Sequence, residues 1–197
     1  MGQTCEGATV TDPDAYLLRE NTGTTGLELT ARAAAAALAQ HHIPHLIVGG
    51  FAVQEHGYPR LTIDLDIIVP DVLETAEFLT ADLSGPFARV PGQQDRVKDK
   101  RNGVFIDLLP AGHVAKQGCK VPFPLPEKAS DKPQIVTLEN LISLKLDSWS
   151  NSPLRRLRDK SDAIELITRR KLPRDLGVAE AVRSHYLEIW DGLQAER

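Results

Sequence analysis

The chain has 197 residues, of which 42% are hydrophobic and 25% are charged, and its formal net charge is −4. These values suit a soluble globular domain with a helical appendage, and the acidic balance provides no global basic field for nucleic acid. No apolar run is long enough to span a bilayer, and the N-terminus lacks the basic and apolar regions of a secretory signal. We therefore expect a cytoplasmic protein, and two cysteines without metal-ligand spacing agree with a reducing compartment.

The predicted elements of the first half alternate between helices and strands. Residues 1–25 show no sustained period and are interpreted as a loose arm, and the alanine-dense segment 27–40 predicts a helix. Further on we expect strands at 43–48, 61–69, 87–90 and 103–110, helices at 51–56 and 71–81, and a polar surface hairpin or loop at 91–102. Asp71 is the expected N-cap of its helix.

Three histidines, His41, His42 and His45, follow the first predicted helix. They suggest either a metal site or a solvated helix end. Pro44 separates them, and cationic groups suit the negative end of a helix dipole. We therefore favour a solvated C-terminal turn.

The second half is expected to be helical after a connector. Residues 111–133 contain four prolines with several glycines and lysines, which is typical of a connecting segment. Apolar residues then recur at helical spacing in 137–146, 154–167 and 176–193. We predict three domains or segments: the arm at 1–25, an α/β core at 26–133 and a helical C-terminal segment at 134–197.

The most informative pattern lies between the first two predicted strands. An apolar run ends at Gly49 and Gly50, and a later apolar strand is interrupted by Asp64 and Asp66. Because side chains alternate along a strand, the two carboxylates share one face. Two close carboxylates on an apolar strand repel each other, and a divalent cation such as Mg²⁺ removes that cost.

The glycine pair, the gap that follows it and the Asp-x-Asp triplet together resemble the signature of the nucleotidyltransferase superfamily, of the polymerase-beta-like type. Within it, HGYPRLTIDLDI is similar to the small bacterial branch of AbiEii-type toxins and minimal nucleotidyltransferases. That branch commonly carries Arg-x-Thr before the aspartates, and Arg60 and Thr62 stand there. The superfamily places a third acid on a later strand, where this sequence has Asp107. Many members have Ser where Gly50 stands, which weakens the toxin assignment.

The resemblance extends to a C-terminal pattern in which a Leu-Ile-x-x-Lys helix precedes an Arg-x-Lys-Asp-x-x-Asp helix. Lys145 fills the first lysine position, and the second helix corresponds to residues 156–162. This implies Lys145 as a catalytic cation and Lys160 and Asp162 as nucleotide-binding residues, with Asp159 as the alternative acid. The cations at 155, 156, 158 and 160 form either a solvated helix face or a phosphate-binding patch.

The resemblance implies a mixed sheet flanked by helices with a helical C-terminal segment, and a nucleotidyltransferase activity. The protein would move an NMP from an NTP to an acceptor hydroxyl or phosphate, with release of pyrophosphate. The implied site has Asp64, Asp66 and Asp107 as catalytic ligands of one or two Mg²⁺ ions, with Gly49, Gly50, Arg60 and Thr62 at the nucleotide.

The acceptor stays open at this point. A toxin acting on tRNA or protein, with an antitoxin partner, stands beside an enzyme that modifies an antibiotic or another small molecule. A non-catalytic nucleotide- or partner-binding protein and a metal-dependent phosphodiesterase are the alternatives from other classes. Membrane attachment is not expected.

Overall fold

The computed structural model describes residues 25–196, so the predicted arm lies outside the described residues except for Thr25. The elements are helices α2 (Gly26–Gln40), α3 (Gly49–Glu55), α4 (Val72–Thr80), α5 (Leu138–Asn151), α6 (Leu157–Arg169) and α7 (Arg183–Ala195), a 3₁₀ turn η1 (Glu180–Val182), and strands β1 (Leu46–Val48), β2 (Asp64–Val69), β3 (Phe87–Val90), β4 (Gln93–Asp99) and β5 (Phe105–Pro110). Within residues 25–196 no helix is both long and apolar enough to cross a membrane.

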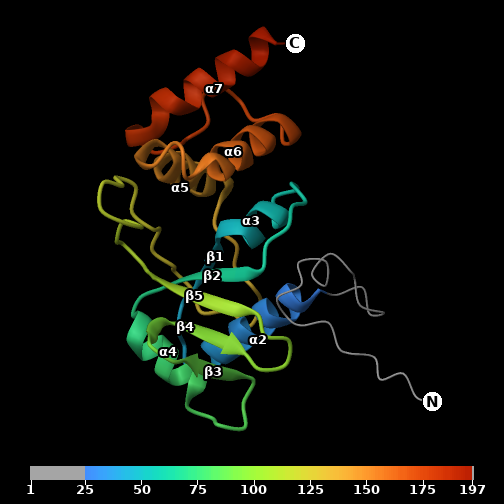
Figure 1. Cartoon of the computed structure of the whole chain (residues 1–197), viewed down its shortest axis with the longest axis vertical. Helices are drawn as coiled ribbons and strands as arrows, with labels where there is room; N and C mark the ends of the chain where they lie inside the picture. The colour runs from blue at the N-terminus through green and yellow to red at the C-terminus, as the bar shows by residue number, and fades with distance from the viewer. Residues whose placement is uncertain (1–24, 197) are drawn as a thin grey trace, which may run out of the picture.

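The five strands form one mixed sheet in the order β1-β2-β5-β4-β3. Strands β2 and β5 are parallel, and every other neighbouring pair is antiparallel. Helices flank the sheet, and α5, α6 and α7 stack together at one end of the molecule, with α3 between them and the strands (Figure 1). The predicted fold class, a mixed sheet with flanking helices and C-terminal helices, is confirmed.

One face of the sheet is covered by α2 and α4. Alternate strand residues such as Leu65, Ile67 and Ile106 are fully buried there, packed against the alanines and leucines of α2. Small side chains let α2 approach the sheet closely, which explains the alanine-dense sequence. At its start, Thr25 and Glu28 form a capping box, each side chain accepting from the other's backbone N–H.

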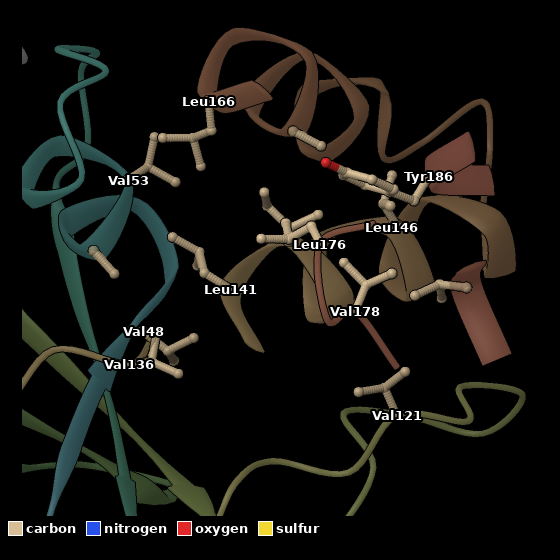
Figure 2. Packing of buried hydrophobic residues seen from close by; sticks show 14 of the residues in the cluster. Val48, Val53, Val121, Val136, Leu141, Leu146, Leu166, Leu176, Val178 and Tyr186 are labelled. Carbon is tan, nitrogen blue, oxygen red and sulfur yellow. The ribbon is translucent and has the colours of Figure 1, made fainter. Parts of the chain in front are cut away.

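The C-terminal helices have a second apolar core, which reaches the opposite face of the sheet. Leu141 and Leu146 of α5 and Leu166 of α6 pack with Val53 of α3 and with Tyr186 of α7 (Figure 2). The phenol of Tyr186 is buried and donates to the backbone carbonyl of Pro173 at 2.6 Å. This core fastens α5 and α6 over the face of the sheet that carries the aspartates.

Three expectations need correction. The loop alternative for 91–102 is wrong, because β4 is an interior strand whose Val97 lies in the core. The helix expected from 154 begins at Leu157, and the helix expected from 176 begins only at Arg183, after the turn η1.

The solvated-turn interpretation fails for His45, whose side chain is only 1% exposed. The chain passes Pro44 and enters β1 at once, so His45 is carried into the interior while His41 and His42 stay at the surface. Neither ring nitrogen of His45 has a hydrogen-bond partner in the described structure. Burial lowers the pKa of His45, and the backbone carbonyl of Ile43 opposes this only in part.

Candidate active site

A transverse row of side chains crosses the sheet on the face toward the C-terminal helices. Val48 pairs with Asp66, Asp66 pairs with Asp107, and Asp107 pairs with Arg96. Directly paired residues on neighbouring strands project to the same face. Asp64 lies on this face too, two residues before Asp66. The register of β2 and β5 therefore gathers the three predicted aspartates.

Asp66 is both buried and close to the other two acids. Burial, and next the negative charges of Asp64 and Asp107, raise the pKa of Asp66 to about 7, against the opposing effect of Lys145 and Arg156. The carboxyl group thus sits where a bound cation would lower its pKa again.

The glycine pair lies directly against these acids at the start of α3. Gly49 has φ +71°, and a Cβ at Gly49 would lie 1.8 Å from Oδ2 of Asp66. A Cβ at Gly50 would lie 2.3 Å from Oγ1 of Thr62. Thr62 in turn donates from that hydroxyl to Oδ1 of Asp64 at 3.1 Å. Both glycines are needed because the backbone passes so close to Asp66 and Thr62.

We expect Gly49→Ala to destabilise the fold by more than a backbone effect. The left-handed conformation costs a non-glycine residue about 1–2 kcal/mol, and the clash with Asp66 adds to that. Gly92→Ala is the matched control, since Gly92 has φ +76° but nothing within 4 Å of its added Cβ. Urea unfolding measures both variants, and equal destabilisation would contradict the close contact.

Arg60 and Lys145 meet at one buried carboxylate on α6. Arg60 donates from Nη2 to Oδ2 of Asp162 at 3.0 Å, and Nζ of Lys145 lies 2.7 Å from the same oxygen. Lys145 also donates to Asp159 at 2.9 Å. Burial raises the pKa of Asp159, but Lys145 and then Arg156 outweigh it, and the pKa lies below its usual value. The two acids that the sequence left as alternatives thus both contact Lys145.

These groups surround a cavity of about 410 Å³. Asp64, Asp66, Asp107, Gly49, Gly50, Arg60, Thr62, Lys145 and Asp159 all line it, whereas Asp162 and Lys160 are not among its lining residues. Lys160 instead places Nζ over the ring of Trp149, 4.4 Å from its centroid. Arg156 and Arg158 are the lining cations at the start of α6. Nine of the eleven residues predicted for the site therefore share one cavity, counting Asp159.

The apolar wall of the cavity comes from a segment that the sequence showed only as a connector. Cys119, Val121 and Phe123 are among the residues that line the cavity. Asp147 of α5 holds this segment, because its carboxylate accepts from the backbone N–H groups of Lys120 and Val121 at 2.9–3.1 Å. Sequence reasoning missed Asp147, although an acid inside an otherwise amphipathic helix was a usable signal.

Sequence reasoning also missed Arg96. Its guanidinium holds Asp107 through two hydrogen bonds, one of them from Nη2 to Oδ2 at 2.6 Å. These bonds raise the pKa of Arg96 above its usual value. Both oxygens of the third aspartate are therefore engaged by a cation of the protein itself.

The donor set suits a hard divalent cation, since Mg²⁺ takes carboxylate oxygens and the crowding at Asp66 favours added positive charge. In the conformation of residues 25–196, however, no three His, Cys, Asp or Glu side chains are grouped closely enough to hold a metal ion. Asp64 and Asp66 fit such an ion as they stand. Asp107 fits by residue type and face, but it is paired with Arg96.

No protein-family model matches the sequence, and no curated protein matches it. Among solved structures, the chain is similar to the solution structure of the antibiotic-resistance factor ANT(2'')-Ia, with 15% identity, 86% of this chain and 97% of that chain covered, and a TM-score of 0.45. The crystal structure of ANT(2'')-Ia in complex with adenylyl-2''-tobramycin gives 15% identity, 84% and 99% coverage, and a TM-score of 0.49. A CCA-adding enzyme in complex with CTP gives 20% identity, 86% and 43% coverage, and a TM-score of 0.42.

Proposed function

We propose that this protein is a Mg²⁺-dependent nucleotidyltransferase that transfers an NMP from an NTP to an acceptor hydroxyl or phosphate and releases pyrophosphate. The observation that carries the proposal is the pairing of Asp66 with Asp107, with Asp64 on the same face of the sheet, beside the glycine start of α3. A nucleotide-sized cavity opens over this arrangement.

Each group has a separate role in the proposal. Asp64, Asp66 and Asp107 would hold one or two Mg²⁺ ions, which supply charge neutralisation at the phosphates and activation of the attacking oxygen. Backbone N–H groups at Gly49 and Gly50 donate to the triphosphate. In this proposal Asp107 would also take the proton of the acceptor hydroxyl.

The cations of α5 and α6 have different roles. Lys145 is held in place by Asp159 and Asp162 and contributes positive charge at the cavity wall. Arg158 is exposed, lines the cavity and takes part in none of the ion pairs found among residues 25–196. Arg158 is therefore the free cation for the departing pyrophosphate.

Isothermal titration with each NTP, with and without Mg²⁺, tests the proposal. We expect Mg²⁺-dependent binding of at least one NTP and loss of that binding in the Asp64→Ala/Asp66→Ala double variant. Pyrophosphate release on addition of acceptor then separates transfer from phosphodiester hydrolysis. Binding that the double variant retains, or no binding of any NTP, would contradict the proposed site.

The acceptor is decided by labelled NTP in three parallel arms: tRNA, protein, and a cationic small molecule such as an aminoglycoside or lincosamide. Arg155 and Arg158 are exposed and have no ion-pair partner within the described structure, and Arg158 lines the cavity, which favours a phosphate-bearing acceptor such as tRNA. Label in tRNA or protein would support a toxin with an antitoxin partner. Label in the small molecule alone would support an antibiotic-modifying enzyme.

A further inference from the structure

The third aspartate of the site is occupied by a cation that belongs to the chain. Arg96 and Asp107 are direct register partners on antiparallel strands β4 and β5, so both side chains leave the sheet on the same face. The pair is partly buried, with side chains 30% and 24% exposed. Paired in this forked way, a guanidinium and a carboxylate fix each other's orientation as well as their charge.

The Arg96–Asp107 pair is consistent with the way the three acids are arranged. The residues of the described chain include no three-ligand group placed to hold a metal ion, although Asp66 and Asp107 are register partners. Both hydrogen bonds of Asp107 go to Arg96 on β4, which flanks β5 on the edge opposite to β2 and Asp66. A carboxylate so engaged offers an ion only its remaining lone pairs, and the guanidinium competes with that ion for its negative charge.

Arg96 also contacts a second side chain, Phe105. Its Cζ is 5.2 Å from the centroid of the Phe105 ring, which sits two residues before Asp107 on β5. A guanidinium that leaves the carboxylate keeps this cation–π contact, so release does not strand a charge. The structure thus offers Arg96 two partners, of which only one is a ligand of the proposed metal.

Resting on the proposed function above, we propose that Arg96 is a positioning residue that competes with the metal ion for Asp107. In the metal-free protein Arg96 holds Asp107 and offsets repulsion among the acids. Binding of the ion would draw Asp107 toward Asp64 and Asp66, and Arg96 would keep its contact with Phe105. Arg96 thereby keeps the three-carboxylate site incomplete until an ion occupies it.

Direct binding of the ion tests this, with Mn²⁺ followed by the EPR signal of the free ion and Mg²⁺ as competitor. We expect Arg96→Met to bind Mn²⁺ about tenfold more tightly than the wild type, because the ion no longer displaces a forked charged pair. Removing any positive charge near the metal site would also favour cation binding, whether or not that charge contacts Asp107. Lys98→Met controls for that effect.

Lys98 is a close match, since it lies on the same strand and face and also sits over Phe105, 5.4 Å from the ring centroid. We expect Lys98→Met to change Mn²⁺ affinity by less than about twofold. Lys98 is exposed and contacts no acid among residues 25–196, so solvent and salt screen its charge. Equal tightening in both variants would reduce the role of Arg96 to general charge and overturn the competition.

A second measurement follows Arg96 itself by NMR of the arginine Nε–H groups, assigned with Arg96→Lys. We expect a shifted Arg96 signal in the metal-free protein that moves to the position of an unpaired guanidinium as Mg²⁺ saturates the site. A signal unchanged at saturation would overturn the inference while the proposed function stands. Tight Mn²⁺ binding without any NTP binding would overturn the proposed function alone, and no ion binding to either protein would overturn both.

Discussion

Asp66→Asn is expected to abolish Mg²⁺-dependent transfer, by about a thousandfold or more, and at the same time to stabilise the metal-free protein above pH 7. The loss of activity follows from removing a carboxylate ligand from the centre of the row. The gain in stability follows from the raised pKa of Asp66, about 7 against a usual value of 3.8.

The direction of the pH effect follows from proton binding. Below about pH 4 Asp66 is protonated in both the folded and the unfolded protein, and the substitution should change stability little. Between about pH 4 and pH 7 the unfolded chain loses this proton while the folded protein keeps it, so the stability of the wild type falls as pH rises. Above pH 7 the accumulated loss relative to Asp66→Asn amounts to roughly 3–5 kcal/mol.

Urea unfolding of both proteins at pH 4.5, 5.5 and 7.5, without metal, measures this difference. Groups that do not interact with Asp66 cancel in the comparison between the two proteins at each pH. Asp131→Asn, at an exposed carboxylate, serves as control and should show no pH-dependent difference. Mg²⁺ should raise the stability of the wild type by mass action but not that of Asp66→Asn. A constant difference across pH would contradict the buried, repelled state of Asp66.

The face of the sheet on which Asp64 and Asp66 lie was predictable, because it depends only on the local geometry of the strand. Strand alternation alone places Asp64 and Asp66 together, and the close approach of backbone to carboxylate requires glycine at Gly49. Asp107 was identified from its position in an unbroken apolar strand. The register that sets Asp107 beside Asp66 is a long-range property, and the family resemblance supplied it in advance.

Arg96 was not predictable because nothing local distinguishes it. Segment 93–99 has a single apolar residue, Val97, so its polar composition conceals an interior strand. A register slip of one residue between β4 and β5 would turn Arg96 to the other face of the sheet. The same limit applies to Asp147 and to the cavity wall at 119–123, since irregular chain has no periodicity from which to infer a contact.

For the cations of α6, the motif and the cavity single out different residues. Lys160 was chosen as a nucleotide-binding residue by its place near the end of the Arg-x-Lys-Asp pattern. In the structure Lys160 covers Trp149, and Arg158, two residues earlier, reaches the cavity. On a helix two residues are about 200° apart, so a shift of two moves a side chain to nearly the opposite side.

Lys145→Met is expected to destabilise the protein by about 3–5 kcal/mol and to remove its activity. Lys145 is 8% exposed and is shared by Asp159 and Asp162, which are 4% and 1% exposed. Removing the ammonium leaves two buried carboxylates that depend on Arg60 and Arg156 alone, and an unpaired buried charge carries a large cost. Urea unfolding measures the loss, with Lys132→Met at an exposed lysine as control.

A double variant separates support of the fold from a direct role in the cavity. In Lys145→Met/Asp159→Asn the side chain at position 159 is neutral. Its remaining partner, Arg156, has a half-exposed side chain that water can solvate. We expect the double variant to recover about 1–2 kcal/mol of the lost stability. If Lys145 supplies charge to the nucleotide, NTP binding stays weak despite this recovery, because the cation is still missing from the cavity wall. Binding that returns together with stability would instead assign Lys145 a structural role only.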